Sequence, residues 1–169
     1  MKHTIMALVE NESGVLAHVA GMFAARGFNI DSLVVGRTED PAISRMTIVV
    51  VGDDRILEQV RKQLEKIVTV VKVRDFADVE YVERDLMLLR IHVPPDKRHE
   101  VVSLVDLFRG RIVDIARNSM MVELSGTEEK IEAFIDLVRP YGIRELARTG
   151  VIAMQRGEQK KPASASDEE

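Results

Sequence analysis

The sequence predicts an α+β protein in which two β-α-β-β-α-β units follow one another along the chain. Three observations support this fold class. Short apolar runs of strand length alternate with segments whose apolar residues recur every three or four positions, as on one face of a helix. Clusters of Gly, Pro, Asn and Asp separate these segments. The order of segments in the first half of the chain recurs in the second half.

The first unit begins close to the N-terminus. Gly27 is expected to end its first helix, because glycine tolerates the left-handed conformation that follows many helix C-termini. Asp53 or Asp54 is expected to cap its second helix, because a short carboxylate side chain accepts hydrogen bonds from free N–H groups. In chain order, the expected elements are strand 4–9, helix 15–23, strand 30–35, strand 43–51, helix 56–67 and strand 68–73.

The second unit repeats this order. Pro94, Pro95 and Asp96 end its first strand and start a helix, which Gly110 is expected to close. Thr127 is expected to cap the other helix, with two glutamates in the first turn, where carboxylates complement the helix dipole. The expected elements are strand 86–93, helix 101–108, strands 112–116 and 120–124, helix 131–138 and strand 143–149.

The order β-α-β-β-α-β is that of the split-βαβ, ferredoxin-like motif, in which two helices cover one face of a four-stranded antiparallel sheet. The other face of each sheet is expected to stay uncovered, and an apolar face of this kind favours oligomerisation. We expect domains over residues 1–78 and 79–155, with the boundary near the charged segment 78–84. The polar residues 156–169 are expected to form a disordered tail.

The composition restricts the class of function. The net charge of −4 argues against a nucleic-acid-binding surface, which usually has to be cationic. Without cysteine the chain has no thiol nucleophile and no thiolate metal site. Its four histidines show no metal-ligand spacing, and no nucleophile has an evident base beside it, so we expect no metal site and no catalytic residue. A secretion signal and an apolar run of the ~20 residues that span a bilayer are both missing, so we expect a cytoplasmic protein without a membrane partner.

Residues 11–16 form the first candidate site, at the predicted turn between the first strand and the first helix. The start of a helix presents unpaired N–H groups and a partial positive charge, so it can hold a carboxylate. Gly14 lets a ligand approach the backbone closely. Asn11 offers both a donor and an acceptor, which suits the two charged ends of an amino acid.

Residues 27–33 form the second candidate site, where the first helix leads into the second strand. In a dimer with adjoining sheets, Asn29 could face the Asn11 turn of the other chain, and a ligand would then lie between the subunits. An apolar wall for an aliphatic side chain would consist of Val15, Leu16, Ile30 and Val35.

Each of these residues also has a purely structural interpretation. Asn11 or Ser13 could serve only as the N-cap of the first helix. Gly14 could be an ordinary turn glycine, and Asn29 an ordinary loop residue. The residues by themselves leave both interpretations open.

The same two segments carry a resemblance to known proteins. Asn11-Glu12-Ser13-Gly14-Val15-Leu16 resembles the ligand turn of ACT domains, which are small amino-acid-sensing modules, although many of these have a proline where this chain has a serine before the glycine. Gly27-Phe28-Asn29-Ile30-Asp31-Ser32-Leu33 resembles a signature of the acetohydroxyacid synthase (acetolactate synthase) small subunit. Residues 45–50 and 84–88 are also similar to that family, and the likeness covers roughly residues 2–155.

The resemblance implies a regulatory subunit that is not itself an enzyme. It would associate with a large catalytic subunit in branched-chain amino-acid synthesis, raise its activity and confer feedback inhibition, usually by valine. Thiamine diphosphate, Mg²⁺ and FAD would belong to that catalytic subunit, and none of them to this chain. The resemblance also implies a homodimer formed through the ACT domains. The residues that it places in contact with the effector are Asn11, Gly14, Val15, Leu16, Asn29 and Ile30.

Three other functions fit the same fold. The main alternative is a free-standing ACT sensor that controls a different enzyme or a transcription factor, and the segment 27–33 and the second domain disfavour it. An RNA-binding module would need aromatic side chains on its inner strands, which segments 46–51 and 86–93 lack. A hydrolase resembling acylphosphatase would need an anion-binding arginine in the first turn, and residues 11–13 include none.

Overall fold

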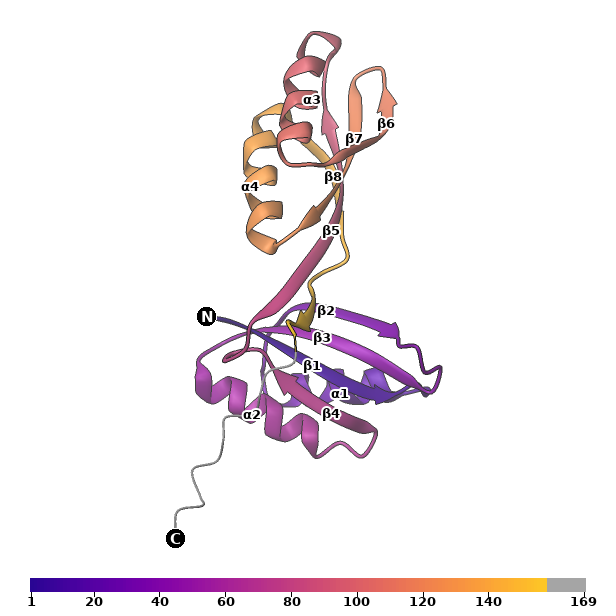
Figure 1. The fold of residues 1–169 in the computed structure, drawn as a ribbon, viewed down its shortest axis with the longest axis vertical. Helices are drawn as coiled ribbons and strands as arrows, with labels where there is room; N and C mark the ends of the chain where they lie inside the picture. The colour runs from indigo at the N-terminus through magenta and orange to yellow at the C-terminus, as the bar shows by residue number, and fades with distance from the viewer. Residues whose placement is uncertain (158–169) are drawn as a thin grey trace.

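The computed structural model describes residues 1–157, and these form two β-α-β-β-α-β units, as the sequence predicts, together with one additional strand. Figure 1 shows the two units joined by β5 (Tyr81–His92), which extends from one unit into the other. In the described part of the chain, no helix has both the length and the apolar character needed to cross a membrane. The prediction of a disordered tail over 156–169 falls almost entirely on residues outside the described part.

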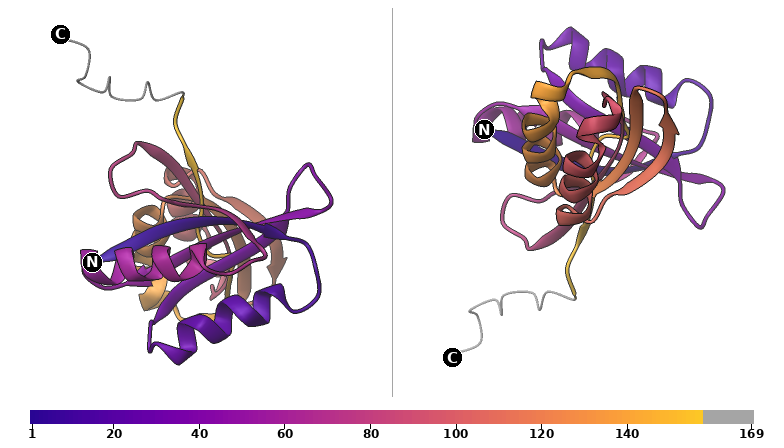
Figure 2. Two further views of the ribbon diagram at one scale, coloured as in Figure 1. Left: turned by 90° about the horizontal axis from the view of Figure 1, so that it is seen from below. Right: turned by 90° about the horizontal axis from the view of Figure 1, so that it is seen from above.

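The N-terminal unit is a four-stranded antiparallel sheet with two helices on one face (Figures 1 and 2). Its elements are β1 (Lys2–Glu10), α1 (Val15–Ala25), β2 (Ile30–Arg37), β3 (Ile43–Val51), α2 (Asp54–Glu65) and β4 (Val70–Asp75). The strand order is β2-β3-β1-β4, so β2 and β4 are the edge strands. Ile5, Ala7 and Val9 alternate along β1 and are buried against the helices, where they form part of the core with Phe23.

The C-terminal unit has the same architecture, with strand order β6-β7-β5-β8. Its elements after β5 are η1 (Pro95–Lys97), α3 (Arg98–Leu107), β6 (Arg111–Ala116), β7 (Ser119–Gly126), α4 (Glu128–Val138), η2 (Arg139–Tyr141) and β8 (Ile143–Arg148). Met87, Leu89 and Ile91 of β5 are fully buried under the helices. Phe134 of α4 packs edge-on against Phe108, with the ring centroids 5.3 Å apart.

The additional strand, β9 (Ile152–Gln155), follows the strand that was expected to be the last. It pairs antiparallel with the first residues of β5, from Tyr81 to Arg84, and this two-stranded ribbon lies against the open face of the N-terminal sheet (Figure 1). Met6 of β1, Phe76 and Ala153 of β9 form a small cluster there, each no more than 4% exposed. The expectation that this face stays uncovered is therefore wrong beneath the ribbon, because the chain itself covers it.

Most of the predicted helix boundaries are confirmed, and one glycine acts differently. Gly27 has a φ of 67° after α1, Asp53 accepts a hydrogen bond from the third residue after it, and Thr127 caps α4 in the same way. After α3, however, the left-handed residue is Arg109 and not Gly110. A Cβ on Gly110 would lie 3.2 Å from a carbonyl oxygen of β7, so glycine there allows closer packing against β7 than a larger residue would.

Polar contacts join the C-terminal unit to the start of β1 and β2. Lys2 Nζ lies 2.8 Å from Asp31 Oδ2 and also contacts Glu128 at the start of α4. The backbone N–H of Val151 donates to Ser32 Oγ at 3.2 Å. The hydrogen bonds to Asp31 and Glu128 raise the pKa of Lys2, so they favour the charged ammonium form of this side chain.

Gly150, in the connector between β8 and β9, lies directly against β2. Its φ is +87°, and a Cβ there would lie 2.8 Å from Ser32 Oγ and 3.1 Å from Val34 Cγ2. Both the backbone conformation and the close approach to β2 therefore require glycine.

A second set of polar contacts lies inside the C-terminal unit, beside the connector between β8 and β9. Asp85 is 1% exposed, and Arg148 Nε donates to its Oδ2 at 2.8 Å. Thr149 Oγ1 donates to the other carboxylate oxygen at 3.3 Å, and Arg148 also contacts Glu132. Burial lowers the pKa of Arg148, but its hydrogen bonds to Asp85 and Glu132 outweigh that effect and raise the pKa above its usual value.

Candidate functional site

Asn11 lies in the turn between β1 and α1. Its backbone N–H donates to the carbonyl oxygen of Ala42 at 2.7 Å, and its side-chain Nδ2 donates to the carbonyl oxygen of Pro41 at 2.9 Å. Both acceptors belong to the loop between β2 and β3, so the turn is fixed at the end of the sheet where β3 begins. The side-chain bond uses only one of the two amide hydrogens, and Asn11 is exposed.

Gly14 is the N-cap residue of α1, and its backbone is left-handed, with φ 88° and ψ −13°. No described side chain caps α1, so the interpretation of Asn11 or Ser13 as its N-cap is wrong. Asp53 and Thr127, in contrast, cap α2 and α4. The first turn of α1 also contains no acidic residue. The N–H of Val15 donates to the carbonyl oxygen of Glu12 at 3.5 Å, and the next N–H groups and the positive dipole end remain available to an external anion.

The space in front of Gly14 is open. A Cβ placed on it would meet no described atom within 4 Å. Leu16 is 45% exposed beside this opening, whereas the side chain of Val15 is 5% exposed and belongs to the core. Leu16 can therefore offer its side chain to a ligand at this turn, and Val15 only its backbone.

Asn29 and Ile30 lie at the opposite end of the sheet. Ile30 pairs with Val50, near the end of β3, whereas the Asn11 turn borders Ala42, just before β3 begins. At about 3.3 Å per residue this separation is roughly 25 Å. Asn29 is exposed, and its carbonyl oxygen accepts a hydrogen bond from the N–H at the end of β3. A single chain therefore does not bring the two predicted segments together.

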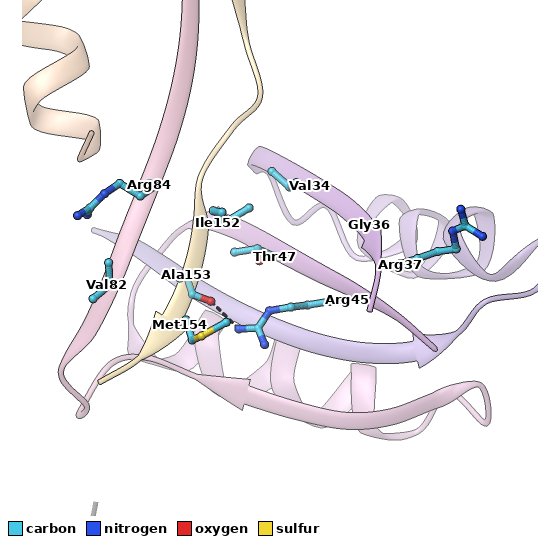
Figure 3. Close-up of a pocket in the computed structure, with 10 residues that line it drawn as sticks. All are labelled: Val34, Gly36, Arg37, Arg45, Thr47, Val82, Arg84, Ile152, Ala153 and Met154. Atoms are coloured by element: carbon cyan, nitrogen blue, oxygen red, sulfur yellow. Dashed lines mark hydrogen bonds between the residues drawn. The ribbon is translucent and has the colours of Figure 1, made fainter. Parts of the chain in front are cut away.

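A groove that the sequence did not predict lies between the open face of the N-terminal sheet and the ribbon of β5 and β9 (Figure 3). Its volume is about 280 Å³, and its lining is mostly apolar. Arg45 reaches across it to the carbonyl oxygen of Ala153, and Figure 3 shows the guanidinium groups of Arg37 and Arg84 turned away. The described lining includes no carboxylate, so this groove lacks the paired charges that a free amino acid needs.

Sequence reasoning also missed the contacts between the two units. Ser32 and Val151 are 119 residues apart, and Lys2 and Glu128 are 126 residues apart. Lys2, Ser32 and Glu128 are of ordinary surface types, and no local pattern in the sequence pairs any of the four residues. Among residues 1–157, no group of three or more His, Cys, Asp or Glu side chains is arranged to hold a metal ion.

The fold and the turn at Gly14 define the class of this protein. The N-terminal unit matches the family described as the AHAS small subunit-like ACT domain over residues 5–72. The C-terminal unit matches the family described as the small subunit of acetolactate synthase over residues 84–157. The chain therefore combines an ACT domain with a second, ferredoxin-like domain.

Individual relatives agree with both family matches. A protein from Archaeoglobus fulgidus described as a probable acetolactate synthase small subunit is 58% identical over 160 residues, which is 95% of this chain and 100% of that protein. The acetolactate synthase small subunit from Aquifex aeolicus is 47% identical over 92% of this chain and 81% of that protein. The crystal structure of the small subunit from Thermotoga maritima superposes with a TM-score of 0.86 and 42% identity, covering 94% of this chain and 99% of that one. The chain belongs to the acetolactate synthase small-subunit family.

Proposed function

We propose that this chain is a regulatory subunit that associates with the large catalytic subunit of acetolactate synthase, raises its activity and makes it subject to feedback inhibition by valine. The observation that carries the proposal is the uncapped start of α1 at Gly14, in a unit that matches the ACT domain of this family. The chain itself performs no chemistry in this role. Thiamine diphosphate, Mg²⁺ and FAD belong to the catalytic subunit in this proposal.

Valine is recognised through its two charged ends and its short aliphatic side chain. The carboxylate accepts hydrogen bonds from the N–H groups of the first turn of α1, where the helix dipole favours an anion. The ammonium group donates to the side-chain oxygens of Asn11 and Asn29. Leu16 and Ile30 contact the isopropyl group. One methylene changes the binding free energy by only about 1–3 kcal/mol, so such a site separates valine from leucine and isoleucine weakly.

A homodimer supplies the geometry that one chain lacks. β2 is an edge strand, and its outer backbone groups can pair with another strand. When two copies pair antiparallel along β2, Ile30 of one copy lies beside the Arg37 end of the other. That end of the sheet is the one at which the Asn11 turn lies. Asn29 of one chain then faces the Asn11 turn of its partner, and the dimer has two equivalent effector sites.

Inhibition requires that valine bind more tightly to one arrangement of the subunits than to another. Coupling free energies of this kind are typically about 1–3 kcal/mol. Valine held between two ACT domains favours one relative orientation of the domains, and the catalytic subunit is then held in a less active arrangement.

The proposal is tested by reconstitution with the large subunit from the same organism. We expect the formation of acetolactate to rise when this chain is added, and to fall again when valine is added. The large subunit alone should not respond to valine. No change in activity on adding the chain would contradict the proposal. Valine binding by the chain without complex formation would instead support a sensor of another enzyme.

A further inference from the structure

The start of β2 takes part in two contacts at once. Asn29 and Ile30 belong to the proposed effector site. Of the next two residues, Ser32 contacts the C-terminal domain directly, and Asp31 is linked to it through Lys2. Asp31 contacts Lys2, which also contacts Glu128, and Ser32 accepts the hydrogen bond from the backbone of the connector. Residues 29–30 therefore directly precede, in the chain, the residues of β2 that link the ACT domain to the second domain.

We propose that these contacts transmit effector binding from the ACT domain to the C-terminal domain, an inference that rests on the proposed function. We call the group the β2 joint. It consists of Lys2, Asp31, Ser32, Glu128 and Val151.

The β2 joint combines a close contact at Gly150 with charged side chains that have room to move. A polar cavity of about 380 Å³ borders it, and the side chains of Lys2, Asp31 and Glu128 are 46%, 33% and 27% exposed. These three charged side chains can therefore shift without breaking close apolar packing, which is the kind of contact that resists displacement. Val151, at 4% exposure, is the buried member of the joint. Gly150 allows the connector between β8 and β9 to lie close to β2, because a side chain at this position would meet Ser32 Oγ.

The joint differs from the other contact between the domains. Where the ribbon of β5 and β9 lies on the N-terminal sheet, Met6, Phe76 and Ala153 are packed almost without exposure. This apolar contact fixes the ribbon to the sheet near its centre. The β2 joint lies at one edge of that sheet, so a change in β2 alters the angle of the C-terminal domain about the apolar contact.

Two pairs of variants test the joint. Glu128→Gln removes the charge that Lys2 bridges, and Glu129→Gln makes the same change at the next, exposed position in the first turn of α4. Gly150→Ala forces a methyl group against β2. Gly157→Ala is its control, since Gly157 also has a positive φ, of 55°, but open space around it.

Valine binding is measured by calorimetry on each purified chain, and inhibition is measured on the enzyme reconstituted with the large subunit. Coupling between sites is commonly worth about 5- to 150-fold, so in the Glu128→Gln and Gly150→Ala enzymes we expect valine inhibition to weaken about fivefold. Their dissociation constants for valine should stay within about twofold of the original chain, as allosteric coupling rather than binding is changed. The two control variants should resemble the original chain in both measurements.

The outcomes separate this inference from the proposed function. If the original chain binds no valine, the proposed function fails. Suppose instead that the original chain binds valine and makes the reconstituted enzyme sensitive to it. If valine then inhibits the Glu128→Gln and Gly150→Ala enzymes to the same extent at the same concentration, the joint does not transmit the signal. Loss of valine binding in both variants would also overturn the inference, because the joint would then be part of the effector site.

Discussion

Replacing Gly14 with aspartate is expected to lower the affinity for valine by about 10- to 100-fold, since charge-assisted hydrogen bonds of the kind lost are worth about 1.5–3 kcal/mol. The new carboxylate would lie at the start of α1, where the carboxylate of valine is proposed to bind, and would repel it. Calorimetric titration of the purified variant with valine measures the effect.

The matched control is Gly14→Asn, which adds a side chain of the same size without a charge. Both substitutions place a non-glycine residue at a φ of 88°, a conformation that Asn and Asp tolerate better than other residues. A Cβ at this position meets no described atom, so both chains should fold. The asparagine variant should bind more tightly than the aspartate variant. Valine binding by Gly14→Asp with the affinity of the original chain would place the effector elsewhere.

Replacing Arg148 with methionine is expected to have the largest effect on stability, lowering the free energy of unfolding of the C-terminal domain by about 3–5 kcal/mol. The substitution leaves the carboxylate of Asp85, whose side chain is 0% exposed, without its cation. Thr149 would remain as a hydrogen-bond donor to Asp85, but it cannot supply the lost charge. Urea denaturation followed by circular dichroism measures the change.

Arg139→Met serves as the control for this prediction. Arg139 pairs with Asp136 one helical turn away, and the two side chains are 65% and 72% exposed. Exposed ion pairs contribute about 0–1 kcal/mol, so the stability of this variant should change little. An Arg148→Met chain with the stability of the Arg139→Met chain would show that the buried pair with Asp85 adds nothing.

Much of the fold could be predicted from the sequence, because it depends on patterns within short segments. Ile131, Phe134, Ile135 and Val138 recur at helical spacing, and all four are buried on α4. The caps at Asp53 and Thr127 depend on residues within one helical turn. Local side-chain chemistry therefore determined these elements and their order.

The elements that could not be predicted depend on contacts between distant parts of the chain. β9 is only four residues long, and it is held as a strand because it pairs with Tyr81 to Arg84 and packs on the N-terminal sheet. The extension of β5 back to Tyr81 depends on the same pairing. Neither half of this ribbon carries a strong local signal of its own.

The candidate site divides in the same way. The turn from Asn11 to Gly14 is a local feature, and its residue types indicate a backbone able to hold an anion. The hydrogen bond from Asn11 to Pro41, which orients this turn, joins residues 30 positions apart and could not be read from the sequence. The distance between Asn29 and this turn is determined by the strand order and by the register of β3, and neither follows from the local sequence.

The central claim, that the effector site is formed by two chains, is tested most directly by a mixed dimer of Asn11→Ala and Asn29→Ala chains carrying different tags and purified through both. Each variant alone should bind no measurable valine, because every site lacks one asparagine. In the mixed dimer, one site lacks both asparagines and the other has both. Calorimetry should therefore find one valine per mixed dimer, with the affinity of the original protein. A mixed dimer that binds no valine would contradict a site shared between the two chains.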